Sequence, residues 1–364
     1  MIRPRWRKVF HDLFDNKART LLVVFSIAVG VFSIGVISGA YEIIQSDMSV
    51  SYAANHPGNI ELRMADFNDD VLASIGNAAG IAQAEGRRVV NFRVRTADSN
   101  KWVTLDIVAL DDFAQNQVNL LAPVDGATSA DKNQILLEED VLKSLDTQVG
   151  DSLSIELADG TIKNLVIVGI VQDASTGAGD FLAPPNAYVT MSTMPTLAQP
   201  QLYNRAYALV SEGQDDLEHI RIIGADLKDK LEKNGAPVFR TRFSETHKHP
   251  LADTVTAVLG ILMALGILIV FLSSSLIANT LNALLNQHMR HIGVIKLVGG
   301  NNRQVLAMYL TLILAFGVLA LAAAIPLGGG GAYGLASFIA GEMGFGLLGY
   351  RIVPLALLIQ ILVG

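Results

Sequence analysis

The chain has 364 residues, no cysteine and a formal net charge of −7, and 51% of its residues are hydrophobic while only 17% are charged. The lack of thiols excludes a disulfide-stapled scaffold, cysteine-ligated zinc, iron–sulfur clusters and a cysteine nucleophile. The apolar content excludes a disordered chain, and the length suggests roughly two domains. A negative net charge argues against a nucleic-acid partner only if it is evenly spread, and here it is not.

Charged side chains are absent from three long stretches: residues 20–41, 254–289 and 304–341. A helix needs about 20 apolar residues to cross a ~30 Å hydrocarbon core, so each stretch predicts a membrane span. The first is longer than the ~7–15 apolar residues of a signal peptide, which predicts an uncleaved anchor. Residues 352–364 are apolar apart from Gln360, and we interpret them as a fourth span cut short by the end of this chain. Buried helices of a soluble protein are the alternative.

Lysine and arginine predict the orientation, because the cytoplasmic flanks of membrane spans are enriched in them. The segment before the first span is basic, and the segment between the second and third spans carries Arg290, Lys296 and Arg303 without an acid. Both segments are predicted to be cytoplasmic. Residues 50–250 hold 28 acids and 17 bases, a net charge of −11, and are predicted to be extracytoplasmic. The short turn 331–351 is predicted to lie on the same side, which makes Arg351 one base that departs from the charge rule. The N-terminal residues expected at the membrane surface are Arg7, Lys8, Lys17 and Arg19.

The outer block predicts an α+β domain. Short runs rich in β-branched and aromatic residues predict strands, and the Asp159-Gly160 pair predicts a hairpin turn. Apolar side chains at helical spacing predict a helix over residues 217–231, and a second helix is predicted over 69–79. Residues 172–185 predict a loop. The predicted strands are 89–95, 102–110, 152–157, 162–171, 187–191, 206–210 and 238–243.

No catalytic arrangement is evident in the outer block. His247 and His249 lie near Asp253, and two histidines with a carboxylate are a conceivable metal site; an interfacial loop is the favoured interpretation. The acidic run at residues 138–140 predicts a solvated face.

The membrane stretches carry small residues and glycines. Four glycines at residues 328–331 follow Pro326 and lack the Lys-Ser/Thr end of a phosphate loop, so we expect them to end the third span and turn the chain. Small residues four apart favour close approach of helices in lipid. The pairs at this spacing are Ser26 with Gly30, Gly35 with Gly39, and Gly330 with Gly334.

The chain has no ATP-binding motif, and its three complete spans lack the central charge of an ion-coupled carrier. These absences predict a motor in a separate subunit. The segment 279–304 predicts a helix at the inner face, apolar at Ile292 and Leu297 and basic at Arg290 and Lys296. Two interpretations stay open for it: a helix resting on lipid headgroups, or a helix that docks on a cytoplasmic partner.

Residues 290–305, RHIGVIKLVGGNNRQV, resemble the Arg-x-x-Glu-Ile-Gly-x-x-x-Ala-x-Gly-Ala signature of the FtsX-like permease domain. Residues 17–21, KARTL, are similar to the segment before the first span of that family. Residues 148–157, QVGDSLSIEL, and 166–171, VIVGIV, resemble the MacB-like periplasmic core domain. The chain departs from the family at His291, where relatives have Glu, so a contact made by that Glu must be made differently here.

The resemblance implies an α-helical integral membrane protein of four spans, the last truncated, with an inserted extracytoplasmic α+β domain. It implies the permease subunit of an ABC transporter of the MacB/LolC/FtsX type, which is not itself an enzyme. A cytoplasmic ATPase dimer would bind ATP and Mg, and a second permease copy, in a homodimer, a heterodimer or the second half of a longer chain, would complete the assembly. An extracytoplasmic adaptor and the lipid membrane are further expected partners, and nucleic acid is not. The expected ATPase-coupling residues are Arg290, Ile292, Gly293, Lys296, Leu297 and Gly299.

The alternative function is a membrane signalling or scaffold protein of the same fold that regulates a cell-envelope hydrolase or sensor. An enzyme in the outer domain is a third hypothesis. The expected segments are a cytoplasmic amphipathic helix (1–19), the first span (20–45), the outer domain (46–250), the second span (251–278), the coupling helix and loop (279–304), the third span (305–330), a short outer loop (331–350) and the start of a fourth span (351–364).

Overall fold

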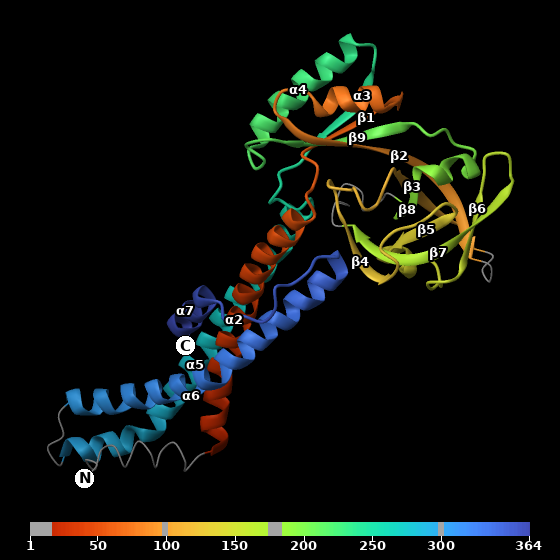
Figure 1. The fold of residues 1–364 in the computed structure, drawn as a ribbon. Coiled ribbons are helices and arrows are strands. Elements are labelled where there is room, and N and C mark those ends of the chain that lie inside the picture. Colours follow the sequence, from red (N-terminus) through yellow and green to blue (C-terminus); the bar gives the residue numbers. More distant parts are fainter. Residues whose placement is uncertain (1–16, 97–100, 174–183, 298–301) are drawn as a thin grey trace. The chain divides into compact units, whose positions relative to one another are not determined.

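The computed structural model describes residues 17–96, 101–173, 184–297 and 302–364, and the chain divides into two compact units (Figure 1). The helical unit comprises Met1–Asp47 and Asp253–Gly364, and the outer unit comprises Met48–Ala252. The outer unit contains the acidic block, and the helical unit contains the apolar stretches.

The described residues of the helical unit form the helices α2 (Lys17–Ala54), α5 (Ala252–Leu297), α6 (Asn302–Met343) and α7 (Pro354–Val363). Within the described part of the chain, three helical segments are long and apolar enough to cross a membrane: Thr20–Ala54, Ala252–Thr280 and Leu306–Met343. Pro354 opens α7, where its missing N–H removes no helical hydrogen bond. Because α7 has only 10 residues, a fourth span stays a prediction.

The glycine run does not end its helix, and the expectation of a turn at this point is wrong. α6 continues through Pro326 and all four glycines to Met343. In hydrocarbon a broken helix leaves backbone N–H and C=O groups without partners, so membrane helices keep their geometry through glycine and proline. The turn between α6 and α7 comes later, where Gly344 and Gly349 have φ values of 69° and 102°.

The outer unit is centred on a ten-stranded mixed sheet in the order β10-β1-β9-β2-β3-β8-β5-β7-β4, with β6 paired to β2 and β7. The other described elements of the outer unit are the α-helices α3 (Asp69–Gly76) and α4 (Leu217–Lys233) and the short 3₁₀ helices η1 (Glu139–Lys143) and η3 (Met191–Leu197). The strands are β1 (Ile60–Phe67), β2 (Ile81–Thr96), β3 (Val103–Leu110), β4 (Leu121–Gly126), β5 (Gln134–Glu138), β6 (Ser152–Glu156), β7 (Ile162–Asp173), β8 (Asn186–Thr190), β9 (Tyr203–Val210) and β10 (Val238–Phe243).

Every predicted strand and helix of the outer block has a counterpart in the structure. The predicted hairpin is β6 with β7, antiparallel from Glu156 opposite Ile162, and Gly160 in its turn has a φ of 81°. Three strands, β1, β4 and β5, were not predicted. β4 is exposed along most of its length and carries Pro123, while β5 is a short buried run without alternation. The loop predicted at 172–185 lies largely outside the described residues.

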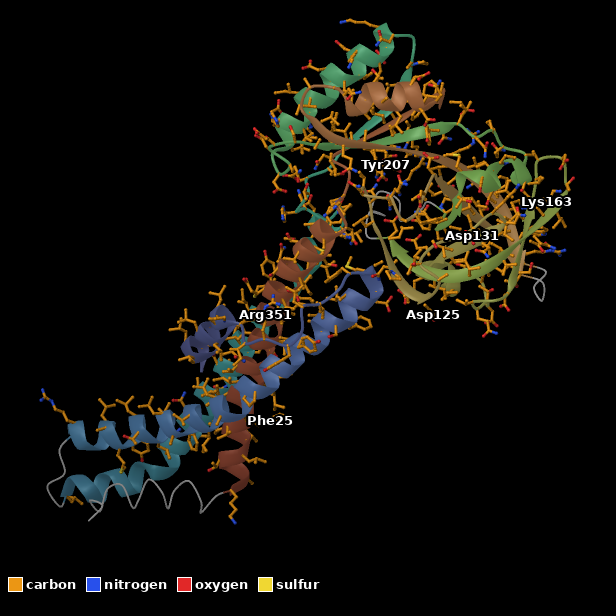
Figure 2. The ribbon with its side chains drawn as sticks, in the orientation of Figure 1. Phe25, Asp125, Asp131, Lys163, Tyr207 and Arg351 are labelled. Atoms are coloured by element: carbon orange, nitrogen blue, oxygen red, sulfur yellow. The ribbon has the colours of Figure 1, made fainter. Side chains whose placement is uncertain are left out.

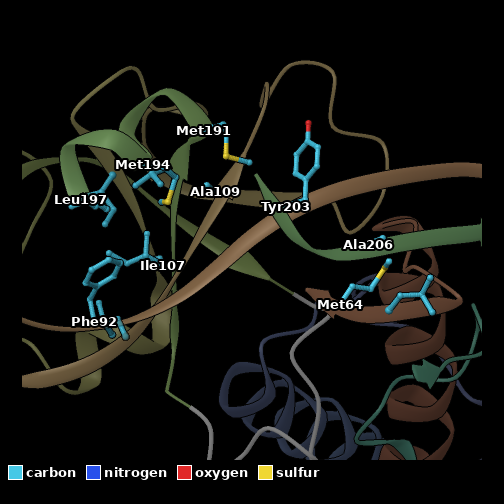
Figure 3. Close-up of a cluster of buried hydrophobic side chains, with 14 of the residues drawn as sticks. Met64, Phe92, Ile107, Ala109, Met191, Met194, Leu197, Tyr203 and Ala206 are labelled. Carbon is cyan, nitrogen blue, oxygen red and sulfur yellow. The ribbon is translucent and has the colours of Figure 1, made fainter. Parts of the chain in front are cut away.

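β2 connects the two parts of the sheet. Its first half pairs with β9 and its second half pairs with β3, and then with β6. One core of buried apolar side chains extends over both parts (Figure 3). Met64 of β1 and Ala206 of β9 belong to the first part, while Phe92 of β2, Ile107 of β3 and Met194 of η3 belong to the second. The outer unit is therefore a single packed body of two joined parts.

Candidate functional site

The C-terminal end of α5 carries most of the expected ATPase-coupling residues. Arg290, Ile292, Gly293, Lys296 and Leu297 all lie on its uninterrupted helical backbone, and exposed Leu297 is its last residue. Gly299 lies outside the described residues, as do two of the expected membrane-surface residues, Arg7 and Lys8. The other two, Lys17 and Arg19, lie in the first turn of α2. α6 begins at Asn302, so only a short connection joins it to α5.

The small residues expected to pack α2 lie against other helices of the helical unit. A Cβ at Gly30 would lie 3.2 Å from Cβ of Ser273 on α5, and a Cβ at Gly39 would lie 2.7 Å from Cβ of Ala332 on α6. Ser26 is buried, and its hydroxyl donates to the backbone carbonyl four residues earlier over 2.8 Å. Gly35 faces Gln360 of α7. α2 therefore packs against α5, α6 and α7.

A buried ion pair ties α2 to the segment before α7. Asp47 is 0% exposed, and Nη1 of Arg351 lies 2.6 Å from its Oδ1 (Figure 2). The N–H of Leu348 donates to the second carboxylate oxygen of Asp47 over 3.0 Å. Arg351 is the base that departs from the charge rule, and its partner Asp47 neutralises it. Gln45 links α2 to α5 through a 2.6 Å hydrogen bond from its amide to the hydroxyl of Thr256.

The two histidines near the start of α5 have separate roles. His247 is exposed, and its Nδ1 lies 2.8 Å from Oδ2 of Asp215. His249 is buried with its ring edge-on to Tyr52, the centroids 5.1 Å apart. Burial lowers the pKa of His249 from 6.5 to about 4, so the ring is neutral. Among the residues that the structure describes, no group of three His, Cys, Asp or Glu side chains could hold a metal ion.

The acidic run at residues 138–140 is only partly a solvated face. Glu139 and Asp140 are exposed at the start of η1, as predicted. Glu138 is buried, and its carboxylate accepts a 2.8 Å hydrogen bond from the N–H of Asn186. The prediction is therefore wrong for Glu138, because the last side chain of β5 points into the unit. Burial, with this carboxylate nearby, raises the pKa of Tyr188.

Two adjacent buried arginines lie where β2 passes from one part of the sheet to the other. Arg87 and Arg88 are 2% and 6% exposed, and successive strand side chains point to opposite faces. Nη2 of Arg87 donates to the carbonyls of Val118 over 2.6 Å and Asn119 over 3.0 Å. Its guanidinium also lies 5.2 Å from the ring centroid of Tyr207. Arg87 therefore holds the segment before β4 against β2.

Arg88 fastens the opposite face of β2. Its Nη1 lies 3.0 Å from Oδ1 of Asp66 near the end of β1, and its Nη2 donates to the side chain of Gln199 over 3.0 Å. Beside it, the Asn204 amide exchanges two hydrogen bonds, of 2.8 and 2.9 Å, with the backbone of Val89. This side chain continues the β2–β9 ladder past its last backbone pair. The junction between the two parts is thus held by polar contacts on both faces.

These polar contacts are not predicted from the sequence, although the residues that make them stand out in it. Gln360 is the one polar side chain in its apolar stretch, and the Arg87-Arg88 pair places two consecutive charges in a strand, directly before Val89 and Val90. Such residues are candidates for buried, partnered groups because burying a polar side chain without a partner is costly.

Two family models match the chain: the MacB-like periplasmic core domain over residues 20–220, more than half of the chain, and the FtsX-like permease C-terminal domain over residues 263–364. No curated protein matches the chain.

Several solved extracytoplasmic domains are similar at low identity. The extracellular domain of the noncanonic ABC-type transporter YknZ from Gram-positive bacteria is 12% identical with a TM-score of 0.36, over 50% of this chain and 98% of that chain. The periplasmic region of MacB from Actinobacillus actinomycetemcomitans is 12% identical with a TM-score of 0.37, over 57% and 95%. A domain of a permease protein from Porphyromonas gingivalis is 11% identical with a TM-score of 0.33, over 53% and 90%.

These TM-scores are below 0.5, so the assignment rests on the two family models, which together match both units. The family's permease subunits are generally non-catalytic and generally work with a cytoplasmic ABC ATPase. The apolar helices and the periplasmic-type domain are those of a membrane protein with an extracytoplasmic segment. The chain belongs to the MacB/FtsX-like family of ABC transporter permeases.

Proposed function

We propose that this chain relays the ATP-driven motion of a cytoplasmic ATPase dimer to its extracytoplasmic domain, for export or mechanotransmission. The observation that carries the proposal is the length of α5, which runs without a break for 46 residues from Ala252 to Leu297. At 1.5 Å per residue this helix is about 69 Å long, more than twice the ~30 Å of a hydrocarbon core. One continuous helix therefore runs from the start of the outer domain to the expected inner contact.

The composition of α5 favours a continuous helix. Proline is one main cause of sharp helix kinks, and α5 contains none. Under this proposal a displacement of the inner end is carried along α5. In this proposal the ATPase contacts Arg290, Gly293 and Lys296, with ATP and Mg bound by the ATPase alone.

The proposed topology follows from the distribution of charge. The basic N-terminal segment and the α5–α6 connection are cytoplasmic, and the acidic outer unit is extracytoplasmic. α7 begins a fourth span, a second permease copy completes the assembly, and an extracytoplasmic adaptor binds the outer domain. The signalling alternative shares the inner contact and differs in what the outer domain binds.

Binding of the ATPase tests the inner contact. The chain is co-purified with a co-expressed cytoplasmic ABC ATPase, as the parent and as Gly293→Asp and Lys296→Glu. Both variants are expected to lose the ATPase, because they place an acid at the inner end of α5. Lys163→Glu is the matched control, since it makes the same charge change at an exposed position on β7. Retention of the ATPase by both inner variants would contradict the proposed contact.

The relay itself is tested by a distance in the outer domain. The chain has no cysteine, so Lys163→Cys gives one spin-label site in each permease copy. The label-to-label distance is expected to change when ATP is added to the complex, and Gly293→Asp is expected to abolish that change. An unchanged distance while ATP is being hydrolysed would rule out a relay to the outer domain.

A further inference from the structure

α7 carries a polar side chain into the interior of the helical unit. Gln360 is 3% exposed, and its Nε2 lies 3.4 Å from the backbone carbonyl oxygens of both Val31 on α2 and Ala324 on α6. α7 therefore reaches two neighbouring helices through one amide group. In an apolar interior no water competes for these carbonyls.

Two glycines uncover the carbonyls that Gln360 reaches. In an α-helix the side chain of a residue leans toward the N-terminus, over the turn that contains the carbonyl four residues earlier. Gly35 follows Val31 by four residues, and Gly328 follows Ala324 by four. A Cβ on either glycine would overlap the Gln360 amide. The same opening is thus built on both helices, and one side chain occupies both.

The rest of the glycine run accommodates other neighbours. A Cβ at Gly329 would lie 3.1 Å from Oη of Tyr350, and a Cβ at Gly331 would lie 2.7 Å from Val36 on α2. At Gly330 a Cβ would meet no atom of the described residues within 4 Å. The run therefore lets α6 stay helical while α7, its preceding segment and α2 all approach closely.

We propose that Gln360, Gly35 and Gly328 form an intramembrane latch that fixes α7 to α2 and α6, so that these three helices move as one body in the permease. The Asp47–Arg351 pair ties the segment before α7 to α2 at a second point. Gln360 is thereby a positioning residue of the permease. The latch lies within the helical unit and is independent of how the ATPase binds.

The test is a distance between α2 and α7, measured on the full chain in detergent. Phe25→Cys and Leu362→Cys place spin labels on exposed positions of the two helices. Gly328→Ala and Gly35→Ala are expected to widen the distance distribution, because each added methyl displaces the amide. Gly330→Ala is the matched control on the same helix and is expected to leave the distribution narrow. Equal widening by Gly330→Ala would overturn the latch.

Two further variants separate the amide from general packing. Gln360→Met keeps the length of the side chain and removes its hydrogen bonds, so it is expected to fold and to widen the distribution. A narrow distribution in Gln360→Met would overturn the proposal. The double variant Gly328→Ala/Gln360→Ala is expected to match Gln360→Ala alone, because both changes act on one contact. Additive effects of the two changes would likewise contradict a shared latch.

Discussion

The two units bury polar side chains in opposite ways. In the outer unit the buried Arg87 and Arg88 are surrounded by carbonyls, carboxylates and amides from several segments. In the helical unit Gln360 meets two backbone carbonyls that glycines leave open. In an outer domain, loop residues can form hydrogen bonds with a buried polar side chain. In a bundle of apolar helices, the available partners are mainly backbone carbonyls.

This difference in how polar side chains are buried predicts which substitutions disturb each unit most. A buried charge with several partners is held by many contacts, and its removal leaves all of them without a donor. A neutral amide in a glycine opening is held by its hydrogen bonds together with the close fit of the opening, so an added methyl disturbs it as much as loss of the amide. The stability of the outer unit is therefore expected to fall when a buried polar side chain is truncated. The packing of the helical unit is expected to loosen when a methyl group is added to a glycine.

The largest expected effect is at the junction of the outer unit. Arg87→Ala removes the donor to Val118 and Asn119 and is expected to lower the free energy of unfolding by about 3–5 kcal/mol. Urea unfolding is followed by the fluorescence of Trp102, in a Trp6→Phe background that leaves it as the sole tryptophan. Arg87→Lys keeps the charge but lacks the planar fork, so it should recover only part of the loss.

Arg93→Ala is the control for this experiment. Arg93 lies on the same strand but is exposed, with an ion pair of 2.9 Å to Glu156, and such pairs contribute less than about 1 kcal/mol. Its guanidinium also lies 5.3 Å from the ring centroid of Trp102, so unfolding of this variant is followed by far-UV circular dichroism. A loss for Arg87→Ala no larger than that for Arg93→Ala would contradict the role of the buried arginine in the junction.

Much of the outer unit was predictable because its sequence alternates and carries turn residues. The Asp159-Gly160 turn fixes the register of β6 and β7, and the apolar stripe of α4 buries Ile220, Leu227 and Leu231. β1 also alternates, with Ile60 and Leu62 buried, and was still missed. Which distant strands pair with β2 could not be predicted, since that depends on contacts such as those of Arg88, far apart in the chain.

The helical unit was predictable in composition and less so in detail. Long uncharged stretches identify membrane helices by length alone. The same glycines that end helices in water are compatible with a continuous helix in lipid, so the end of α6 was placed too early. The partners of Gly35 and Gly328 could not be predicted either, because the sequence does not say which helix faces each glycine.

The second largest expected effect is a pH dependence of the free energy of unfolding of the outer unit. The pKa of His249 is about 4 in the fold and 6.5 in its ordinary state, so between these values the unfolded chain binds a proton that the folded chain does not. The free energy of unfolding is therefore expected to fall by about 2–3 kcal/mol as the pH falls through this window, and this group adds no slope above it.

His249→Phe should remove this part of the slope while keeping an aromatic ring against Tyr52. The measurement is urea unfolding at several pH values between 4 and 7.5, with His219→Gln as a control at an exposed histidine. If His249→Phe and the parent show the same slope between pH 4 and 6.5, His249 does not titrate as the buried site requires.

The smallest expected effect concerns the Asp47–Arg351 ion pair at the edge of the helical unit. Asp47→Ala leaves Arg351 without its carboxylate, but Arg351 is 34% exposed and water can solvate it. The expected loss is thus about 1–2 kcal/mol, below that of a fully buried pair. A double-mutant cycle with Arg351→Ala in thermal unfolding measures the coupling, and Glu42→Ala, an exposed acid on the same helix, is the control. A coupling near zero would mean that the segment before α7 is held by packing alone. A loss as large as that of Arg87→Ala would mean that charges in the helical unit are as strongly buried as those of the outer unit.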